Sequence, residues 1–344
     1  MVLLTAAESI ATRRPADRLR PVRIWLYVIA LMVLAMVVIG GITRLTESGL
    51  SITEWKPVTG IVPPLNDTEW QAAFEAYKQI PQYEVLNQGM SLEAFQFIYF
   101  WEWLHRALGR IIGIAFAIPF LIFLIQRRFS WKLALPLGTL FVLGGLQGAL
   151  GWWMVTSGLT ELTSVSQYRL AAHLVAALAL FLALIWVARR LEPRAIAGSV
   201  RWPAASLLLL VVLQVGAGAF VAGLDAGQGY NTWPLMDGAL IPAGLGAIDP
   251  LWRNLFENAL TVQFVHRMLA YAILLHAGLL LLFRADRSGW PLRILVLIAL
   301  QAGLGIATLL LAVPLPLALG HQALAFMLAA ATIAWLADVT PKRA

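Results

Sequence analysis

The chain has 344 residues, of which 60% are hydrophobic and 12% are charged, and its formal net charge is +7. Soluble domains carry about 25% charged residues, so this composition excludes a soluble globular protein and predicts an integral membrane protein. The positions of the basic residues argue for contact with a lipid bilayer and against a nucleic-acid partner. Because the chain has no cysteine, a disulfide, a thiolate metal site and a C-x-x-C-H heme attachment are excluded. A metal ion would need His, carboxylate or Met ligands.

Residues 1–23 form an arginine-rich tail, which we expect on the cytoplasmic side. The apolar run that follows is long enough to cross a bilayer, so it predicts a first membrane helix rather than a cleaved signal peptide. A membrane span needs roughly 20 apolar residues. Segments of this kind predict an all-α protein with eight transmembrane helices, at residues 24–43, 97–125, 133–155, 166–188, 203–224, 259–283, 291–313 and 316–337.

The distribution of Lys and Arg predicts the orientation in the membrane. One side of the predicted topology holds 17 of the 25 basic residues. By the positive-inside rule this side is the cytoplasm, so we expect both termini inside. The other side has two long loops, residues 44–96 and 225–258, which are rich in Asp, Glu, Pro and Trp. In the first loop we expect a short helix near residues 67–79, with Asp67 or Thr68 as its N-cap.

The chain contains an internal repeat. Residues 40–55 align without a gap with residues 218–233, which lie 178 positions later, and EWLHR at 102–106 aligns with QFVHR at 263–267. Each half has four spans, so both halves enter the membrane in the same direction and the repeat is parallel. We therefore predict two pseudo-symmetric four-helix bundles. They cover residues 24–190 with the outer loop 44–96, and residues 202–338 with the outer loop 225–258.

Each of the second, fourth, sixth and eighth predicted spans has one histidine near its outer edge. These four lie roughly five to eight residues past that edge, so all four are expected about 10 Å deep. Paired imidazoles inside a helical bundle are typical axial ligands of heme iron, and the pattern predicts one such pair in each half. The four candidate ligands are His105, His173, His266 and His321. The fifth, His276, aligns with Ala115, and we expect it to be structural.

Glu102 precedes His105 by three residues, so both side chains share one helix face. An ionisable pair in a membrane span is costly and indicates a functional site. The aligned residue in the second half is Gln263, so only the first half keeps an acid beside its candidate ligand. We expect Glu102 to accept or relay a proton. The alternative is a structural salt bridge with Arg106. A di-iron site is disfavoured, because it needs a second Glu-x-x-His motif and further carboxylates.

Arg106 and Arg267 follow the first histidine of each half. Their guanidinium groups are candidates to bind heme propionates, which are anionic. The alternative is that both side chains reach the lipid head groups. Arg169, at the start of the fourth span, is a weaker candidate.

With these residues the chain resembles heme A synthases over almost its whole length. The resemblance implies an oxidoreductase that converts heme O to heme A by oxidising the C8 methyl group to a formyl group in successive hydroxylations, for use in cytochrome oxidase. It also implies that His266 and His321 bind the iron of a heme b cofactor, that His105 and His173 bind substrate heme O, and that Glu102 is required for activity. Without cysteines the chain is similar to the proteobacterial and mitochondrial branch.

The resemblance further implies a place in the bacterial inner (plasma) membrane, with the heme sites toward the periplasm. The expected partners are heme O, the heme O synthase, cytochrome oxidase assembly factors and an electron-transfer partner that the sequence does not identify. A homo-oligomer is left open. The main alternative is a di-heme electron carrier of the cytochrome b type, and a transporter is a third reading. Ligands at one shared depth argue against electron transfer across the membrane.

Overall fold

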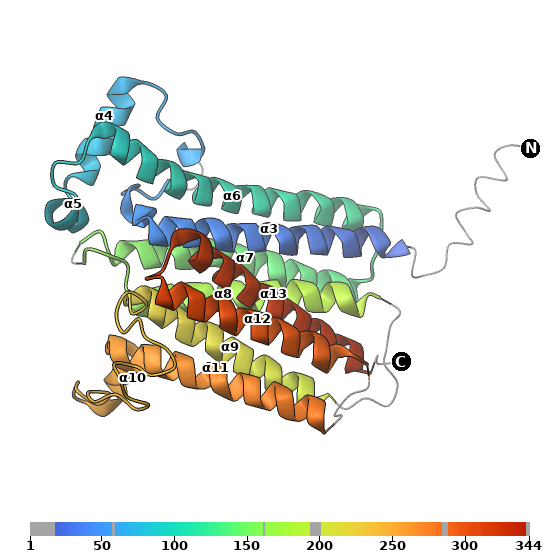
Figure 1. Ribbon diagram of the computed structural model, residues 1–344. Coiled ribbons are helices and arrows are strands. Elements are labelled where there is room, and N and C mark those ends of the chain that lie inside the picture. Colours follow the sequence, from blue (N-terminus) through green and yellow to red (C-terminus); the bar gives the residue numbers. More distant parts are fainter. Residues whose placement is uncertain (1–17, 57–58, 161, 193–200, 284–287, 342–344) are drawn as a thin grey trace, which may run out of the picture.

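The computed structural model describes residues 18–56, 59–160, 162–192, 201–283 and 288–341. Most of the predicted arginine-rich tail therefore lies outside the described residues. The described chain is helical, and eight of its helices are long and apolar enough to cross a membrane, with a mean hydropathy of 1.6 to 2.6 (Figure 1). The eight predicted spans are confirmed as α3 (Arg20–Leu45), α6 (Leu92–Ile125), α7 (Trp131–Thr156), α8 (Gln167–Arg190), α9 (Trp202–Gly223), α11 (Ala259–Leu282), α12 (Trp290–Leu310) and α13 (Leu315–Val339).

Helix α6 begins five residues before the predicted span, at Leu92. The reason is a cap: the Ser91 hydroxyl accepts a hydrogen bond from the amide of Ala94, which satisfies one of the free N–H groups of the first turn. The extra turns extend α6 beyond the predicted span, so that its N-terminal end lies beside the helices of the first outer loop (Figure 1).

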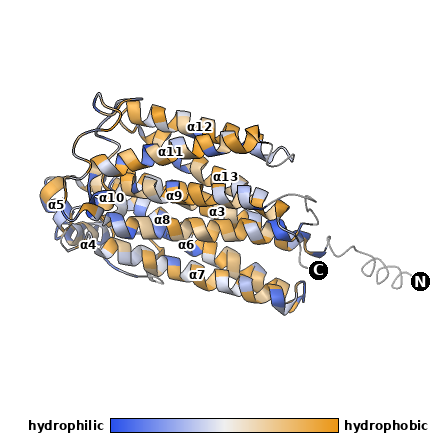
Figure 2. Cartoon of the chain, turned by 90° about the horizontal axis from the view of Figure 1, so that it is seen from below, coloured by the Kyte–Doolittle hydropathy of each residue, from blue (hydrophilic) through white to orange (hydrophobic). Residues whose placement is uncertain are grey.

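The long helices pack as two rings of four. In the first ring α3 packs on α6 and α8, and α7 packs on α6 and α8. In the second ring α9 and α12 each pack on α11 and α13. Contacts of α8 with α9 and of α13 with α3 and α8 join the rings, and the buried apolar core lies along this junction. Figure 2 shows hydrophobic residues along the length of the spans, including their outward faces, as expected for helices that face lipid.

The first outer loop contains η1 (Ser48–Leu50), η2 (Thr59–Ile61), α4 (Asp67–Tyr77) and α5 (Pro81–Leu86). The expected helix is α4, but the expected N-cap is wrong. The side chain of Asn66 caps the helix by accepting from the amide of Glu69, which leaves Asp67 inside the first turn. Phe74 of α4 stacks on Phe95 of α6 with 4.9 Å between ring centroids, so α4 packs against the N-terminal end of α6. The second outer loop contains η3 (Leu251–Arg253) and α10 (Asn254–Glu257).

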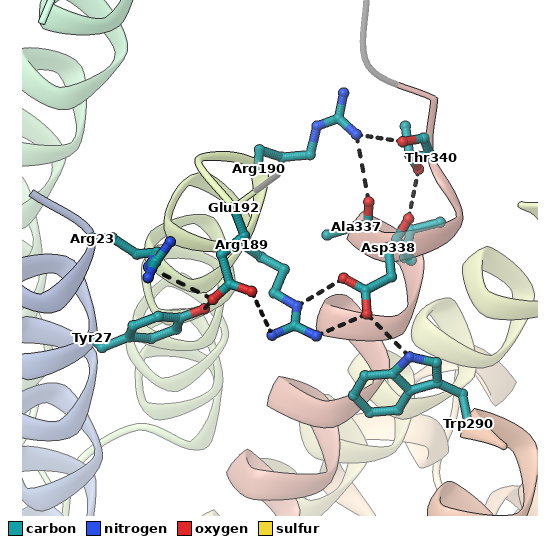
Figure 3. Close-up of polar contacts among 10 residues, drawn as sticks. Arg23, Tyr27, Arg189, Arg190, Glu192, Trp290, Ala337, Asp338 and Thr340 are labelled. Atoms are coloured by element: carbon teal, nitrogen blue, oxygen red, sulfur yellow. Dashed lines mark hydrogen bonds and ion pairs between the residues drawn. The ribbon is translucent and has the colours of Figure 1, made fainter. Parts of the chain in front are cut away.

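At the opposite end of the spans, a buried ion pair ties the two rings together (Figure 3). The Arg189 guanidinium of α8 donates to both oxygens of Asp338 in α13, each at 2.8 Å. Trp290 of α12 also donates to Asp338, and Glu192 binds Arg189 at 3.2 Å and accepts from Tyr27 of α3 at 3.3 Å. This cluster, which we call the inter-ring clamp, therefore connects four of the spans.

Candidate functional site

Each of the four candidate ligands lies against a glycine of a neighbouring span. A Cβ atom added to that glycine would lie 2.7 to 3.1 Å from Cε1 of the imidazole, which is closer than side chains normally approach. Glycine is therefore required if the ring is to stay where it is. The four pairs are Gly40 of α3 with His105 of α6, Gly151 of α7 with His173 of α8, Gly218 of α9 with His266 of α11, and Gly305 of α12 with His321 of α13. Sequence reasoning missed these contacts, although the glycines align between the halves.

Glutamine side chains hold three of the four histidines. Gln147, Gln214 and Gln301 donate from Nε2 to the backbone carbonyl oxygens of their histidines, at 2.7, 3.1 and 2.9 Å. Each amide nitrogen also lies 3.1 to 3.5 Å from a nitrogen of the ring, in His173, His266 and His321 respectively.

The position equivalent to Gln214 in the first half is Met36. His105 therefore has no matching glutamine, and among the described residues its Nδ1 has no hydrogen-bond partner. The two halves thus differ in how firmly their first histidine is held.

The geometry of the second pair fits a metal ion between two imidazoles. The ring centroids of His266 and His321 are 6.5 Å apart and their planes are inclined by 72°. Two imidazoles that bind one metal ion from opposite sides at about 2.0–2.1 Å each place their centroids roughly 6.4 Å apart. Within the described chain, Nδ1 of both rings is buried without a hydrogen-bond partner and lies on the glycine side of the ring, whereas Nε2 lies 3.2 and 3.5 Å from the glutamine amides.

The described residues contain no group of three or more His, Cys, Asp or Glu side chains that could hold a metal ion. A metal at either histidine pair would therefore have two protein ligands. A macrocycle such as heme supplies the four remaining positions, whereas a zinc site normally needs three or four protein ligands. His105 and His173 resemble the second pair in that each imidazole lies against a glycine of a neighbouring span.

Glu102 is buried, with 3% of its surface exposed, and both carboxylate oxygens are hydrogen-bonded. Oε1 accepts from Nη2 of Arg106 at 2.6 Å. Oε2 accepts from the Ser51 hydroxyl and from the amide of Ile52, each at 2.7 Å. The salt bridge considered as the alternative for Glu102 is therefore present, and it is part of a contact between α6 and the outer loop.

Gln263 occupies the same place in the second half, but the direction of its hydrogen bonds with the outer loop is reversed. Its Nε2 donates to the carbonyls of Ala226 and Gly229 at 2.6 and 2.8 Å, and its Oε1 accepts from Arg267 at 2.8 Å. The first loop thus presents donors to a carboxylate, whereas the second loop presents acceptors to an amide. The difference between Glu102 and Gln263 has a structural reason in addition to any chemical one.

Arg106 and Arg267 bind the outer loops. Arg106 donates to the carbonyls of Ile52 and Glu54 at 2.8 and 3.0 Å. Arg267 donates to the carbonyls at the two aligned positions, Tyr230 and Thr232, both at 2.8 Å. Each arginine therefore binds an outer loop to the helix that carries a candidate ligand, at the residue next to that ligand. Their contact with propionates stays a prediction.

Arg169, the weaker propionate candidate, and His276, expected to be structural, both have partners within the protein. Arg169 donates to the carbonyl of Trp153 at 2.7 Å and its guanidinium lies 4.7 Å from the ring of that residue. His276 lies with Nε2 at 2.9 Å from the hydroxyl of Ser206, a bond between α11 and α9 that agrees with a structural role.

The sequence matches the family model of COX15-CtaA, described as cytochrome oxidase assembly protein, over residues 23–333. The chain belongs to this family. The match covers all four histidines and all eight spans, and it confirms the resemblance inferred from the sequence. Three curated proteins that are similar to this chain are named heme A synthase.

The COX15-CtaA relative from Azorhizobium caulinodans is 57% identical over 326 residues, which cover 92% of each chain. The relative from Bradyrhizobium diazoefficiens is 55% identical over 90% of this chain and 89% of its own. The relative from Allorhizobium ampelinum is 50% identical over 98% of this chain and 96% of its own. Similarity along the full length shows that both halves, and not one bundle alone, are shared with these proteins.

Proposed function

We propose that the chain is a heme A synthase, which oxidises the C8 methyl group of heme O to a formyl group and so supplies heme A to cytochrome oxidase. Relatives that are similar to this chain over almost its whole length carry this name. The observation that carries the proposal in the structure is the duplicated histidine pair, seated on glycine in both halves but accompanied by an acid in only one. A duplicated site in which one copy is chemically distinct suits one resident heme and one reacting heme.

We assign the second bundle, residues 202–338, to a heme b cofactor held by His266 and His321. The support is the 6.5 Å spacing of the rings and the glutamine bonds to both residues. When bound, this heme supplies one-electron redox chemistry. The glutamine amides keep the two imidazoles in place, as other outer partners of metal ligands do.

We assign the first bundle, residues 24–190, to heme O as substrate, held by His105 and His173. A substrate has to enter and its product has to leave. Met36 in place of a glutamine leaves His105 without the hydrogen bond that its counterpart His266 has, which agrees with a site that exchanges its occupant.

Glu102 lies one helical turn from His105, and its position is set by Arg106 and by two donors of the outer loop. From there the carboxylate accepts or relays a proton as the methyl group is oxidised, or it stabilises positive charge that develops nearby. The loop covers this end of the bundle and restricts water. Arg106 and Arg267 are our candidates for the propionates, at the end of the spans that we predict to be periplasmic.

The test is to express the protein with heme O supplied and to extract its hemes. We expect heme b together with heme A, identified by mass and by the pyridine-hemochrome spectrum of the formyl-bearing product. Heme b alone would instead favour a di-heme electron carrier of the cytochrome b type. The heme O synthase, cytochrome oxidase assembly factors and an electron-transfer partner are the proteins that we expect to act with the chain.

A further inference from the structure

An apolar groove lies between α7 and α8, on the membrane-facing side of the first ring. It consists of two adjoining cavities of about 390 Å³ each, which share Leu140 and Ala183 in their walls. Small-molecule sites in proteins typically have volumes of this order. Several lining side chains are open to the membrane side, such as Leu143, which is 43% exposed, and Leu146, which is 58% exposed.

The groove begins at the candidate substrate site. Gln147 lines the cavity nearer to His173 and also donates a hydrogen bond to the carbonyl of His173. The cavity farther from His173 reaches Trp186 and Val187, which lie 13 and 14 residues after His173 on α8. At 1.5 Å per residue the groove therefore runs roughly 20 Å away from the ligand, toward the end of the spans that we predict to be cytoplasmic.

The second half has larger side chains at the equivalent places. Helix α8 lines the groove with Ala176 and Ala179, whereas the aligned positions of α13, 148 residues later, are Leu324 and Met327. The groove is thus associated with the half that carries Glu102.

We propose that the groove binds the farnesyl chain of heme O and thereby sets the rotation of the porphyrin in the substrate site; this inference rests on the proposed function. Two histidines alone do not fix the rotation of the ring about the axis through the iron, and the propionate contact that we propose for Arg106 does not by itself distinguish the two methyl groups that flank the propionates. Heme O has several ring methyl groups, and only one of them becomes the formyl group. The farnesyl chain distinguishes one edge of the ring from the others, so a groove that holds it selects the methyl group that reaches Glu102.

The chemistry of the groove and its place favour this occupant. Its lining is apolar apart from Gln147 and Thr139, as an isoprenoid chain requires, and its upper end touches the residue that holds His173. Heme b has no farnesyl chain. The half that we assign to heme b has Leu324 and Met327 at the positions equivalent to Ala176 and Ala179 of the groove. Because lipid is as apolar as the groove, occupancy adds packing and orientation rather than a hydrophobic driving force.

The test fills the groove. Ala179→Met and Ala176→Leu, alone and combined, introduce the side chains of the second half, and Ala179 is exposed, so its replacement leaves the helix packing intact. Ala205→Leu, at an exposed position of α9 outside the groove, is the control. We expect heme A formation to fall roughly 10- to 100-fold in the groove variants, because a shift of about 1 Å in a reacting group can cost this much. We also expect the purified variants to hold less heme O relative to protoheme, which is the heme b that we assign to the second bundle and has no farnesyl chain, while the ratio in the control is unchanged.

Wild-type rates and an unchanged ratio of heme O to protoheme in the Ala179→Met variant would overturn the inference and leave the proposed function standing. Equal loss of heme O and protoheme would also overturn it, since the chain would then make no difference. If the unmodified protein forms no heme A from heme O, the proposed function itself is wrong. If an acyl chain of the bilayer occupies the groove instead, we expect the first of these outcomes, which is wild-type rates and an unchanged ratio of heme O to protoheme.

Discussion

A Cβ atom on Gly305 would lie 2.7 Å from Cε1 of His321, the tightest of the four contacts between a glycine and a candidate ligand. The imidazole is thus seated on the backbone of the adjacent span. This contact makes the ring position sensitive to the smallest substitution, a single methyl group, on a residue that touches no heme iron itself.

We expect Gly305→Ala to displace the His321 ring and to reduce heme b content about 10-fold or more, as changes beside metal ligands commonly do. The matched control is Gly303→Ala, on the same helix, where an added Cβ meets open space. Heme content per protein, read from the pyridine-hemochrome spectrum, is the measurement. Full heme b content in the Gly305→Ala variant would show that His321 does not bind iron in this position.

In the first half, Gly151→Ala should act in the same way on His173, where a Cβ would lie 2.9 Å from Cε1. Here we expect retained heme b, with heme A formation reduced about 10-fold or more. Gly148→Ala, three residues earlier on α7 and facing open space, is the control. Loss of heme b instead of product would reverse the assignment of the two halves.

For Glu102 the structure separates a chemical role from a loop-holding role. Ser51→Ala removes one donor to Oε2 but leaves the carboxylate and its salt bridge with Arg106 in place. We expect this variant to form heme A within about 10-fold of the wild-type rate, because Arg106 and the amide of Ile52 still bind the carboxylate, and the one lost hydrogen bond, to a charged group, contributes about 1.5–3 kcal/mol. Glu102→Gln should retain the hemes and stop heme A formation. If Ser51→Ala is equally inactive, the function of Glu102 is to hold the loop.

The inter-ring clamp predicts a stability effect without a direct catalytic one. Asp338→Ala leaves the Arg189 guanidinium, 17% exposed, with Glu192 as its remaining acid. Removing one partner of a buried ion pair is costly, so we expect thermal unfolding in detergent to begin about 5 °C lower at a fixed scan rate. Glu75→Ala, which breaks the exposed pair with Lys78 in α4, should have almost no effect. Equal shifts in the two variants would contradict this account of the clamp.

The predicted orientation is open to a direct test because the chain has no cysteine. Gln88→Cys, shortly before α6, and Lys132→Cys, shortly after it at the start of α7, place single thiols at exposed positions near opposite ends of the spans. A membrane-impermeant maleimide added to spheroplasts should label the first thiol, and the second only after the membrane is opened. The reverse pattern would place both termini outside.

Reasoning from the sequence succeeded where one property dominates along the chain. The eight spans follow from hydropathy alone, because lipid forces apolar helices of nearly uniform length. It failed at local details. Asn66 rather than Asp67 or Thr68 caps α4, and Ser91 starts α6 earlier than the apolar run does. Such boundaries depend on single hydrogen bonds that hydropathy does not report.

The candidate site was accessible in part. The four histidines could be singled out because the repeat places them in register, and Glu102 stood out against Gln263. The glycine contacts and the glutamines that hold His173, His266 and His321 were not found. Their signal was present in the aligned LQGALG and LQAGLG segments, which contain Gln147 with Gly151 and Gln301 with Gly305.

The sequence by itself determined that this is a membrane protein of eight spans; it also predicted that its halves are related and which side chains we propose to bind iron, since these features depend on composition, periodicity and residue type. Only the tertiary structure decided what surrounds those side chains. It joined Glu102 to a loop 50 residues away, turned the exchange of Glu for Gln into a reversal of hydrogen-bond direction, and opened an apolar groove beside one histidine pair. These features arise from contacts between distant segments, which no local pattern in the chain encodes.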